Sequence, residues 1–214
     1  VQASIDLDRR RATEANHTAT HLLHAALRSV LGEHVKQAGS LVGPLRLRFD
    51  FTHFQALSDE EIAAVEAIVN EKIRQNISLA VVEMSLEEGL RSGAMAIFEE
   101  KYGERVRLVS VGDYSRELCG GAHVRTTGEI GFFKVIAESS VAAGMRRIEA
   151  LTGEEALKHV QEIEQLVHQA AAASSVSRKD LLTQIHKIQD QAREKEHEIR
   201  ALRRNKTQTG AATD

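Results

Sequence analysis

The sequence predicts an α+β fold, a largely antiparallel sheet with packed helices, followed by an antiparallel helical hairpin. Three observations lead to this prediction. Segments with helical apolar spacing are interspersed with short segments that alternate apolar and polar residues, as strands do. The strand segments are close enough in sequence to form hairpins, which favours antiparallel pairing. From Gly153 onward the sequence has no proline, cysteine or aromatic residue, and two heptad-like segments follow.

Composition limits the class of protein. The 214 residues are 42% hydrophobic and 28% charged, enough to bury a core. No apolar run is long enough for a membrane helix. Since the sequence starts at Val1 without a signal-type apolar stretch, we interpret it as a fragment of a longer cytoplasmic protein. The formal net charge of -3 means that contact with nucleic acid would need local basic patches.

The first predicted elements are a helix and a hairpin. Asn16 is expected to cap the helix, which continues to a stop at Gly32. Residues 35–54 then alternate in polarity on either side of a turn at residues 43–44, the pattern of a strand hairpin.

Further elements complete the first of two predicted domains, residues 1–152. Ser58 followed by Glu61 three residues later predicts the start of an amphipathic helix that runs through Ile73. The other elements expected here are a helix over 86–98 and strands at 79–82, 106–111, 132–136 and 148–151.

The second predicted domain, residues 153–214, is a coiled-coil arm. Apolar residues recur at alternating spacings of four and three over 156–170 and 181–202. The segment between them breaks the phase, and Ser177 with Asp180 resembles a capping box for the second helix. We therefore expect two antiparallel helices that share an apolar seam.

Two pairs of side chains that can bind a metal share one spacing. His17 and His21 are four residues apart, as are Cys119 and His123. On a helix, residues at i and i+4 lie on one face. One thiolate and three imidazoles form a tetrahedral set that suits Zn²⁺. Because Cys119 is the only cysteine, no disulfide can form within the chain. The alternative is that these spacings arose by chance.

The role of the metal stays open at this point. Four protein ligands would close a tetrahedral shell, whereas a catalytic zinc usually keeps one position for water. One ligand could be displaced, the ion could become five-coordinate, or it could position substrate while water is activated elsewhere. A closed structural site is the alternative.

Longer motifs around the ligands resemble a known family. They occupy residues 10–23, 34–42, 115–123 and 127–131. In this order they are similar to the editing domain of alanyl-tRNA synthetase, over residues 1 to about 152, and the tail resembles the helical linker that follows it. The sequence departs from the family at Ala122, where threonine is usual. Because Ala122 is not a predicted ligand, the metal set is unaffected.

The resemblance implies hydrolysis of tRNA(Ala) mischarged with serine or glycine, releasing the amino acid. A pocket shaped for alanine cannot strongly exclude glycine or an added hydroxyl, so a second site supplies the missing discrimination. The parent enzyme charges alanine using ATP, and this sequence is too short to contain that catalytic domain as well. The expected partner is therefore tRNA, no membrane is involved, and the oligomeric state is left open.

Several residues near the ligands are candidates for substrate contact. The resemblance places Gln37 in the substrate pocket, where its amide could bond the serine hydroxyl and the ester region; an exposed strand position is the alternative. Thr20 could supply a hydroxyl or be an ordinary helix threonine. Gly120 and Gly121 permit close approach of the backbone to substrate, or form a tight turn.

Other polar residues have weaker assignments. Arg146 and Arg147 could meet the tRNA terminus or its phosphates, with surface salt bridges as the alternative. Asp50 is a possible base, or a strand residue that faces solvent. His24 is expected behind the ligands or in the core rather than as a fifth ligand.

Two other functions remain compatible with the sequence. One is a free-standing deacylase that edits mischarged tRNA in trans. The other is a zinc-stabilised module that binds tRNA without hydrolysing it, which an assay of deacylation would distinguish from both enzymes.

Overall fold

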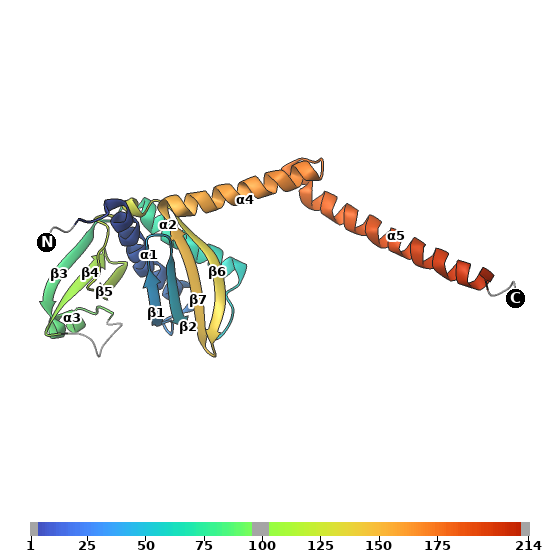
Figure 1. The fold of residues 1–214 in the computed structure, drawn as a ribbon. Helices are drawn as coiled ribbons and strands as arrows, with labels where there is room; N and C mark the ends of the chain where they lie inside the picture. The colour runs from blue at the N-terminus through green and yellow to red at the C-terminus, as the bar shows by residue number, and fades with distance from the viewer. Residues whose placement is uncertain (1–3, 96–102, 211–214) are drawn as a thin grey trace. The chain divides into compact units, whose positions relative to one another are not determined.

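The computed structural model describes residues 4–95 and 103–210 (Figure 1). Its elements in chain order are α1 (Leu7–Leu31), β1 (Gln37–Val42), β2 (Leu47–Thr52), α2 (Asp59–Arg74), β3 (Leu79–Ser85), α3 (Leu86–Arg91), β4 (Arg105–Val111), β5 (Ser115–Leu118), the 3₁₀ turn η2 (Thr127–Ile130), β6 (Phe133–Ala142), β7 (Met145–Thr152), α4 (Gly153–Ala173), η3 (Arg178–Asp180) and α5 (Leu181–Gly210). The predicted α+β class is confirmed. The chain divides into two compact units, residues 1–159 and 160–214.

The strands of the first unit form two antiparallel sheets. One has the order β1-β2-β7-β6 and the other the order β3-β4-β5. The sequence predicted a largely antiparallel sheet, but it missed β5, which has only four residues and precedes the Cys119 loop. The split matters for the site, because β5 belongs to the smaller sheet while the predicted substrate residue Gln37 lies in the larger one.

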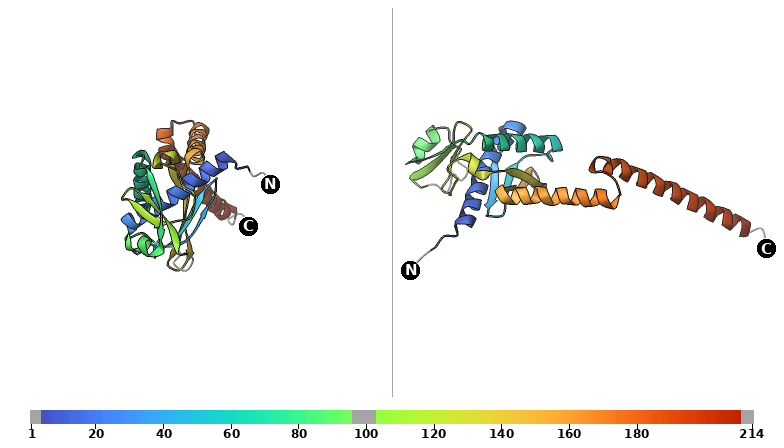
Figure 2. Two further views of the ribbon diagram at one scale, coloured as in Figure 1. Left: turned by 90° about the vertical axis from the view of Figure 1, so that its left-hand side faces the viewer. Right: turned by 90° about the horizontal axis from the view of Figure 1, so that it is seen from above.

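Helix α1 runs between the two sheets and contacts strands of both (Figures 1 and 2). Its side chains Leu22, Leu23 and Leu27 are fully buried in the main core, together with Phe49 and Phe51 of β2. A second, smaller apolar cluster lies in the three-stranded sheet. Because α1 is buried on most sides, its polar residues in the middle turns must find partners within the protein.

The start of α1 differs from the prediction. Asp6, not Asn16, caps the helix, and its carboxylate accepts hydrogen bonds from the backbone N–H groups of Asp8 and Arg9. The first turns of α1 carry mainly charged residues. The apolar spacing from which the helix was predicted therefore begins several residues after the helix itself does. Asn16 is buried instead, and its amide donates to the carbonyl oxygen of Gly43 at 2.8 Å. The predicted end at Gly32 is confirmed, with φ of 115°.

Other local predictions hold where turn and cap chemistry are strong. β1 and β2 form the expected hairpin, and Ser58 begins α2 through a complete capping box with Glu61. The helix predicted over residues 86–98 is shorter, because α3 ends at Arg91. Residues 96–98 of that prediction lie outside the described residues.

The second unit contains most of α4 and all of α5, the two helices that the heptads predicted. Their apolar residues remain exposed, for example Leu166 at 64% and Leu182 at 71%. The predicted antiparallel packing along this seam is therefore not present between residues 160 and 204. Ser177 also differs from a capping box, since its hydroxyl donates to the Asp180 carboxylate at 2.6 Å rather than accepting from the backbone. Within the described residues, no helix has the length and apolar character needed to cross a membrane.

The core of the first unit gives a direct test of the fold. Phe49→Ala should lower the free energy of unfolding by about 3–5 kcal/mol, because it removes a fully buried ring beneath α1 and leaves a cavity. Phe54→Ala is the matched control, since that ring is 85% exposed and its loss should change stability by no more than about 0.5 kcal/mol. Urea unfolding followed by circular dichroism measures both. Equal effects of the two substitutions would contradict the described core.

Candidate metal centre

The structure brings the four predicted ligands to one point. His17 and His21 project from the middle of α1, and Cys119 and His123 lie in the loop that follows β5. One donor atom from each of the four residues lies within 4.8 Å of the others. The Cys119 Sγ atom is 3.4 Å from His17 Nε2 and 3.4 Å from His123 Nε2.

These distances fit a zinc ion at the centre of the cluster. In a tetrahedral shell with ordinary Zn–S and Zn–N bond lengths, sulfur and nitrogen ligand atoms are about 3.5 Å apart. Both measured sulfur to nitrogen distances are close to that value. One thiolate and three imidazoles are also the donor chemistry that zinc prefers. The four residues could therefore hold this metal.

Two histidines of the cluster have a hydrogen-bond partner behind the ring, and the third, His21, lies near a carboxylate without forming a hydrogen bond. The Nδ1 atom of His17 is 3.2 Å from the carbonyl oxygen of Ala122, and that of His123 is 3.2 Å from the Thr18 hydroxyl. The Nδ1 atom of His21 lies 3.3 Å from a carboxylate oxygen of Glu117. Since a carbonyl oxygen can only accept, His17 carries its proton on Nδ1 and leaves Nε2 for a metal.

Burial keeps the imidazoles in the form that binds metals. Burial, helped by the neighbouring charge of His21, lowers the pKa of His17 to about 4. Burial and the same neighbour lower the pKa of His123 to about 2, and burial also lowers the pKa of His21. All three rings are thus neutral at pH 7. Burial raises the pKa of the Cys119 thiol, so binding of a metal would release its proton.

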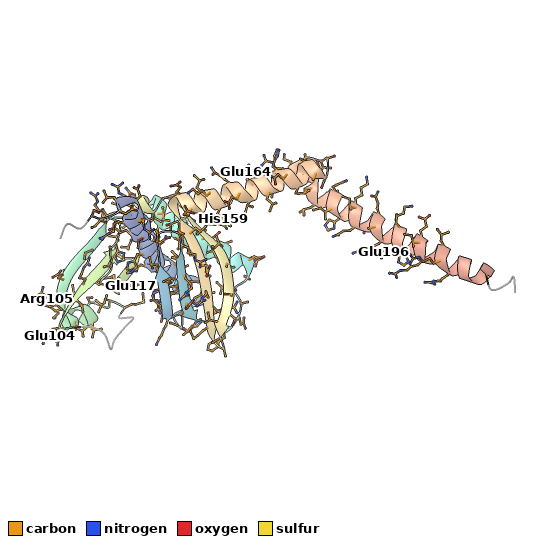
Figure 3. The ribbon with its side chains drawn as sticks, viewed as in Figure 1. Glu104, Arg105, Glu117, His159, Glu164 and Glu196 are labelled. Carbon is orange, nitrogen blue, oxygen red and sulfur yellow. The ribbon has the colours of Figure 1, made fainter. Side chains whose placement is uncertain are left out.

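Glu117 is a member of the site that the sequence analysis missed. It lies in β5 with 1% of its surface exposed, and Figure 3 labels it where β5 faces α1. Burial acts to raise the pKa of Glu117, but His21 and His24 outweigh this effect and hold the pKa below its usual value. The signal in the sequence was the position of Glu117 two residues before Cys119, since alternate residues of an extended segment point the same way.

His24 lies in the core behind the four predicted ligands, as expected from the sequence. Its Nδ1 atom is 3.1 Å from a Glu117 oxygen, and the ring is almost completely buried near Phe49. The buried hydroxyl of Thr20 donates to the carbonyl oxygen of Asn16 at 2.9 Å, a common contact for a helix threonine, and its role in substrate binding stays a prediction.

The two glycines of the loop have different surroundings. A Cβ atom built on Gly121 would lie 2.0 Å from Cε1 of His17, so the ligand ring packs directly against the glycine backbone. A Cβ atom on Gly120 would meet nothing within 4 Å. The Arg107 guanidinium donates to the carbonyl oxygens of both glycines, at 3.0 and 3.3 Å, and so fixes the loop. Gly121 therefore serves the metal cluster, whereas Gly120 leaves open space beside it.

The remaining predicted residues make no hydrogen bond or ion pair with the four ligands in the described part of the chain. The Gln37 amide is partly exposed and donates to the Ser40 hydroxyl at 3.2 Å. Arg146 makes a bidentate pair with Glu138. These contacts leave the substrate role of Gln37 and the tRNA role of Arg146 as predictions.

Arg147 is held by Asp50, and this pair corrects the prediction for Asp50. The guanidinium donates to both carboxylate oxygens, at 2.7 and 2.8 Å. Asp50 is buried, so it is not a strand residue that faces solvent. The hydrogen bond from Arg147 lowers the pKa of Asp50, which makes it a weak base. This ion pair therefore links the neighbouring strands β2 and β7.

A cleft of about 410 Å³ opens beside the cluster. It is lined by Arg11, Glu14, His123, Val124, Arg125 and Glu129. Its polar walls combine two arginines with two glutamates, and the Arg125 guanidinium lies 3.9 Å from the carboxylate of Glu129 in η2. The metal cluster is thus reachable from the side of His123.

Comparison with known proteins agrees with this architecture. Residues 106–149, which include Cys119 and His123, match the family described as threonyl and alanyl tRNA synthetase second additional domain. The alanine–tRNA ligase of Acetivibrio thermocellus is 53% identical over 203 residues, which is 95% of this chain and 23% of that protein. The ligase of Fervidobacterium nodosum is 50% identical over 204 residues, 95% of this chain and 24% of that protein. The ligase of Halorhodospira halophila is 50% identical over 211 residues, which is 98% of this chain and 24% of that protein.

Residues 106–149 therefore resemble a second additional domain of the tRNA synthetase type. Over nearly its whole length the chain is similar to one segment of alanyl-tRNA synthetases, as the motifs around the predicted ligands indicated. It spans about a quarter of the length of the curated relatives it matches.

The two loop glycines provide a matched test of the cluster. Gly121→Ala should reduce bound zinc to well below one ion per chain, because the new methyl group would displace the His17 ring. Gly120→Ala should keep wild-type zinc, since its methyl group enters open space. Elemental analysis of the purified proteins measures both. Equal zinc in the two variants would mean that His17 is not held against Gly121.

Proposed function

We propose that this chain hydrolyses the ester of tRNA(Ala) mischarged with serine or glycine, with Zn²⁺ bound by His17, His21, Cys119 and His123. The observation that carries the proposal is the convergence of these four residues beside an open cleft. The relatives are alanine–tRNA ligases, a name for enzymes that join alanine to tRNA. A hydrolytic site suits such proteins, because packing alone discriminates poorly between alanine, glycine and serine.

The residues of the cleft suit the end of a tRNA. Arg11 and Arg125 supply positive charge to the wall beside His123, and backbone phosphates are bound mainly by such residues. The open space at Gly120 lets a substrate approach the loop closely. When bound, zinc would polarise the ester carbonyl or an attacking water. The chain's own residues hold the three rings neutral and fix their orientation, as the contacts at Nδ1 indicate.

A second candidate is a zinc-stabilised module that binds tRNA without hydrolysis. Four protein ligands complete a tetrahedral shell, and structural zinc sites are closed in this way. We favour hydrolysis because the cleft reaches the cluster at His123, where a ligand could be displaced or a fifth position could open. The two candidates differ in whether the purified chain releases the amino acid.

The zinc-loaded chain should release serine from Ser-tRNA(Ala) and leave correctly charged Ala-tRNA(Ala) intact. Cys119→Ala should lose most of its zinc together with most of this activity, because one of four ligands and the only thiolate are gone. Release of radiolabelled amino acid gives the rate, and elemental analysis gives the zinc content. Zinc-loaded protein that binds tRNA but releases no serine would favour the second candidate. Full zinc in the variant would show that the thiolate is not a ligand.

Substitution of Gln37 tests how the site would select serine. Gln37→Ala should retain zinc and slow deacylation at least several-fold, since one hydrogen bond is worth about 0.5–1.5 kcal/mol. A contact to the serine hydroxyl should slow Ser-tRNA(Ala) more than Gly-tRNA(Ala), whereas a contact to the ester should slow both equally. Ser40→Ala is the matched control, because it removes the present partner of the amide without removing the amide. Unchanged rates on both substrates would exclude Gln37 from the site.

A further inference from the structure

Glu117 places a buried carboxylate directly behind the metal cluster. One oxygen is 3.3 Å from Nδ1 of His21, and the other is 3.1 Å from Nδ1 of His24. The side chain is almost completely buried, and among the described residues no lysine or arginine forms an ion pair with it. Among the described residues its side chain is close to two histidines: His24 forms a hydrogen bond with it, and His21 lies within ion-pair distance without one. Neutral imidazoles supply no full positive charge.

Such a position is costly for an isolated carboxylate. Removing a charge from water is unfavourable unless a compensating charge and hydrogen bonds replace the solvent. His24 and His21 offset part of this cost, and a bound divalent ion would add a full positive charge beside them. The four ligands include a single anion, the Cys119 thiolate, so a zinc ion in this shell keeps one positive charge. The carboxylate of Glu117 brings the sum of zinc, thiolate and carboxylate to zero.

We propose that Glu117 is a positioning residue for the metal. It orients His21 so that Nδ1 faces the carboxylate and Nε2 faces the cluster, and it balances the remaining charge of the zinc shell. His24 holds the second carboxylate oxygen and so keeps Glu117 in place. The proposal rests on the metal cluster of the proposed function but not on hydrolysis, so a chain that binds zinc without deacylating tRNA leaves it intact.

Zinc affinity is the primary test. Glu117→Gln keeps the size of the side chain and removes its charge, and we expect zinc binding about 10–100-fold weaker in competition with a chromophoric chelator. Glu83→Gln is the matched control, because this glutamate belongs to β3 of the same sheet and its side chain is 66% exposed. The control should bind zinc as the wild type does. Unchanged affinity in Glu117→Gln would overturn the proposal.

Melting temperatures with and without zinc separate positioning from a merely structural role. Without zinc, Glu117→Gln should melt close to the wild type, because the amide oxygen can still accept the hydrogen bond from Nδ1 of His24. Zinc should raise the melting temperature of Glu117→Gln by less than it raises that of the wild type. An equal decrease in both states, or a variant that does not fold without zinc, would assign Glu117 a structural role and overturn the proposal.

Glu117→Asp distinguishes charge from shape. This substitution keeps the negative charge at a shorter reach, so the variant should bind zinc more tightly than Glu117→Gln. If Asp and Gln weaken zinc binding equally, charge balance is not what Glu117 contributes, and the proposal fails. A wild-type chain that binds no zinc would overturn both this proposal and the proposed function.

Discussion

The close approach of α1 to the loop after β5 is the constraint on which the site depends. Packing of α1 between the two sheets brings His17 and His21 of the helix to Cys119 and His123 of the loop. The approach is tight enough that His17 lies against the bare backbone of Gly121. No single segment of the chain could form the cluster, because the two ligand pairs are about a hundred residues apart in sequence.

Polar contacts fix this approach in addition to the apolar core. The Thr18 hydroxyl accepts a hydrogen bond from the backbone N–H of Val124 at 3.2 Å and also lies 3.2 Å from the ring of His123. Arg107 holds the loop from the neighbouring strand β4 through the carbonyl oxygens at positions 120 and 121. A metal bound to ligands from both segments would cross-link α1 to the smaller sheet, and its binding energy would then stabilise the fold.

Sequence reasoning succeeded where the chemistry is local. The spacing indicated four residues that the structure brings together, and Gly32 and Ser58 marked helix ends because their caps involve residues within a few positions. It failed where a side chain depends on distant neighbours. Asn16 resembles a cap but bonds Gly43 and Thr152, and Asp50 alternates like a surface residue but pairs with Arg147. Glu117 is hidden for the same reason, since only the packing of β5 against α1 shows what its carboxylate meets.

The two sides of the metal cluster differ in a way that bears on function. On one side His21 and Glu117 are buried, whereas His17, Cys119 and His123 keep partial exposure. The cleft opens on the side of His123, and the buried carboxylate lies on the side of His21. The cleft therefore gives access to the cluster from the His123 side, while buried side chains lie on the opposite side. Under the proposed function, this asymmetry would let four protein ligands coexist with a reactive role, because the partly exposed ligands could shift toward the cleft while His21 stays fixed.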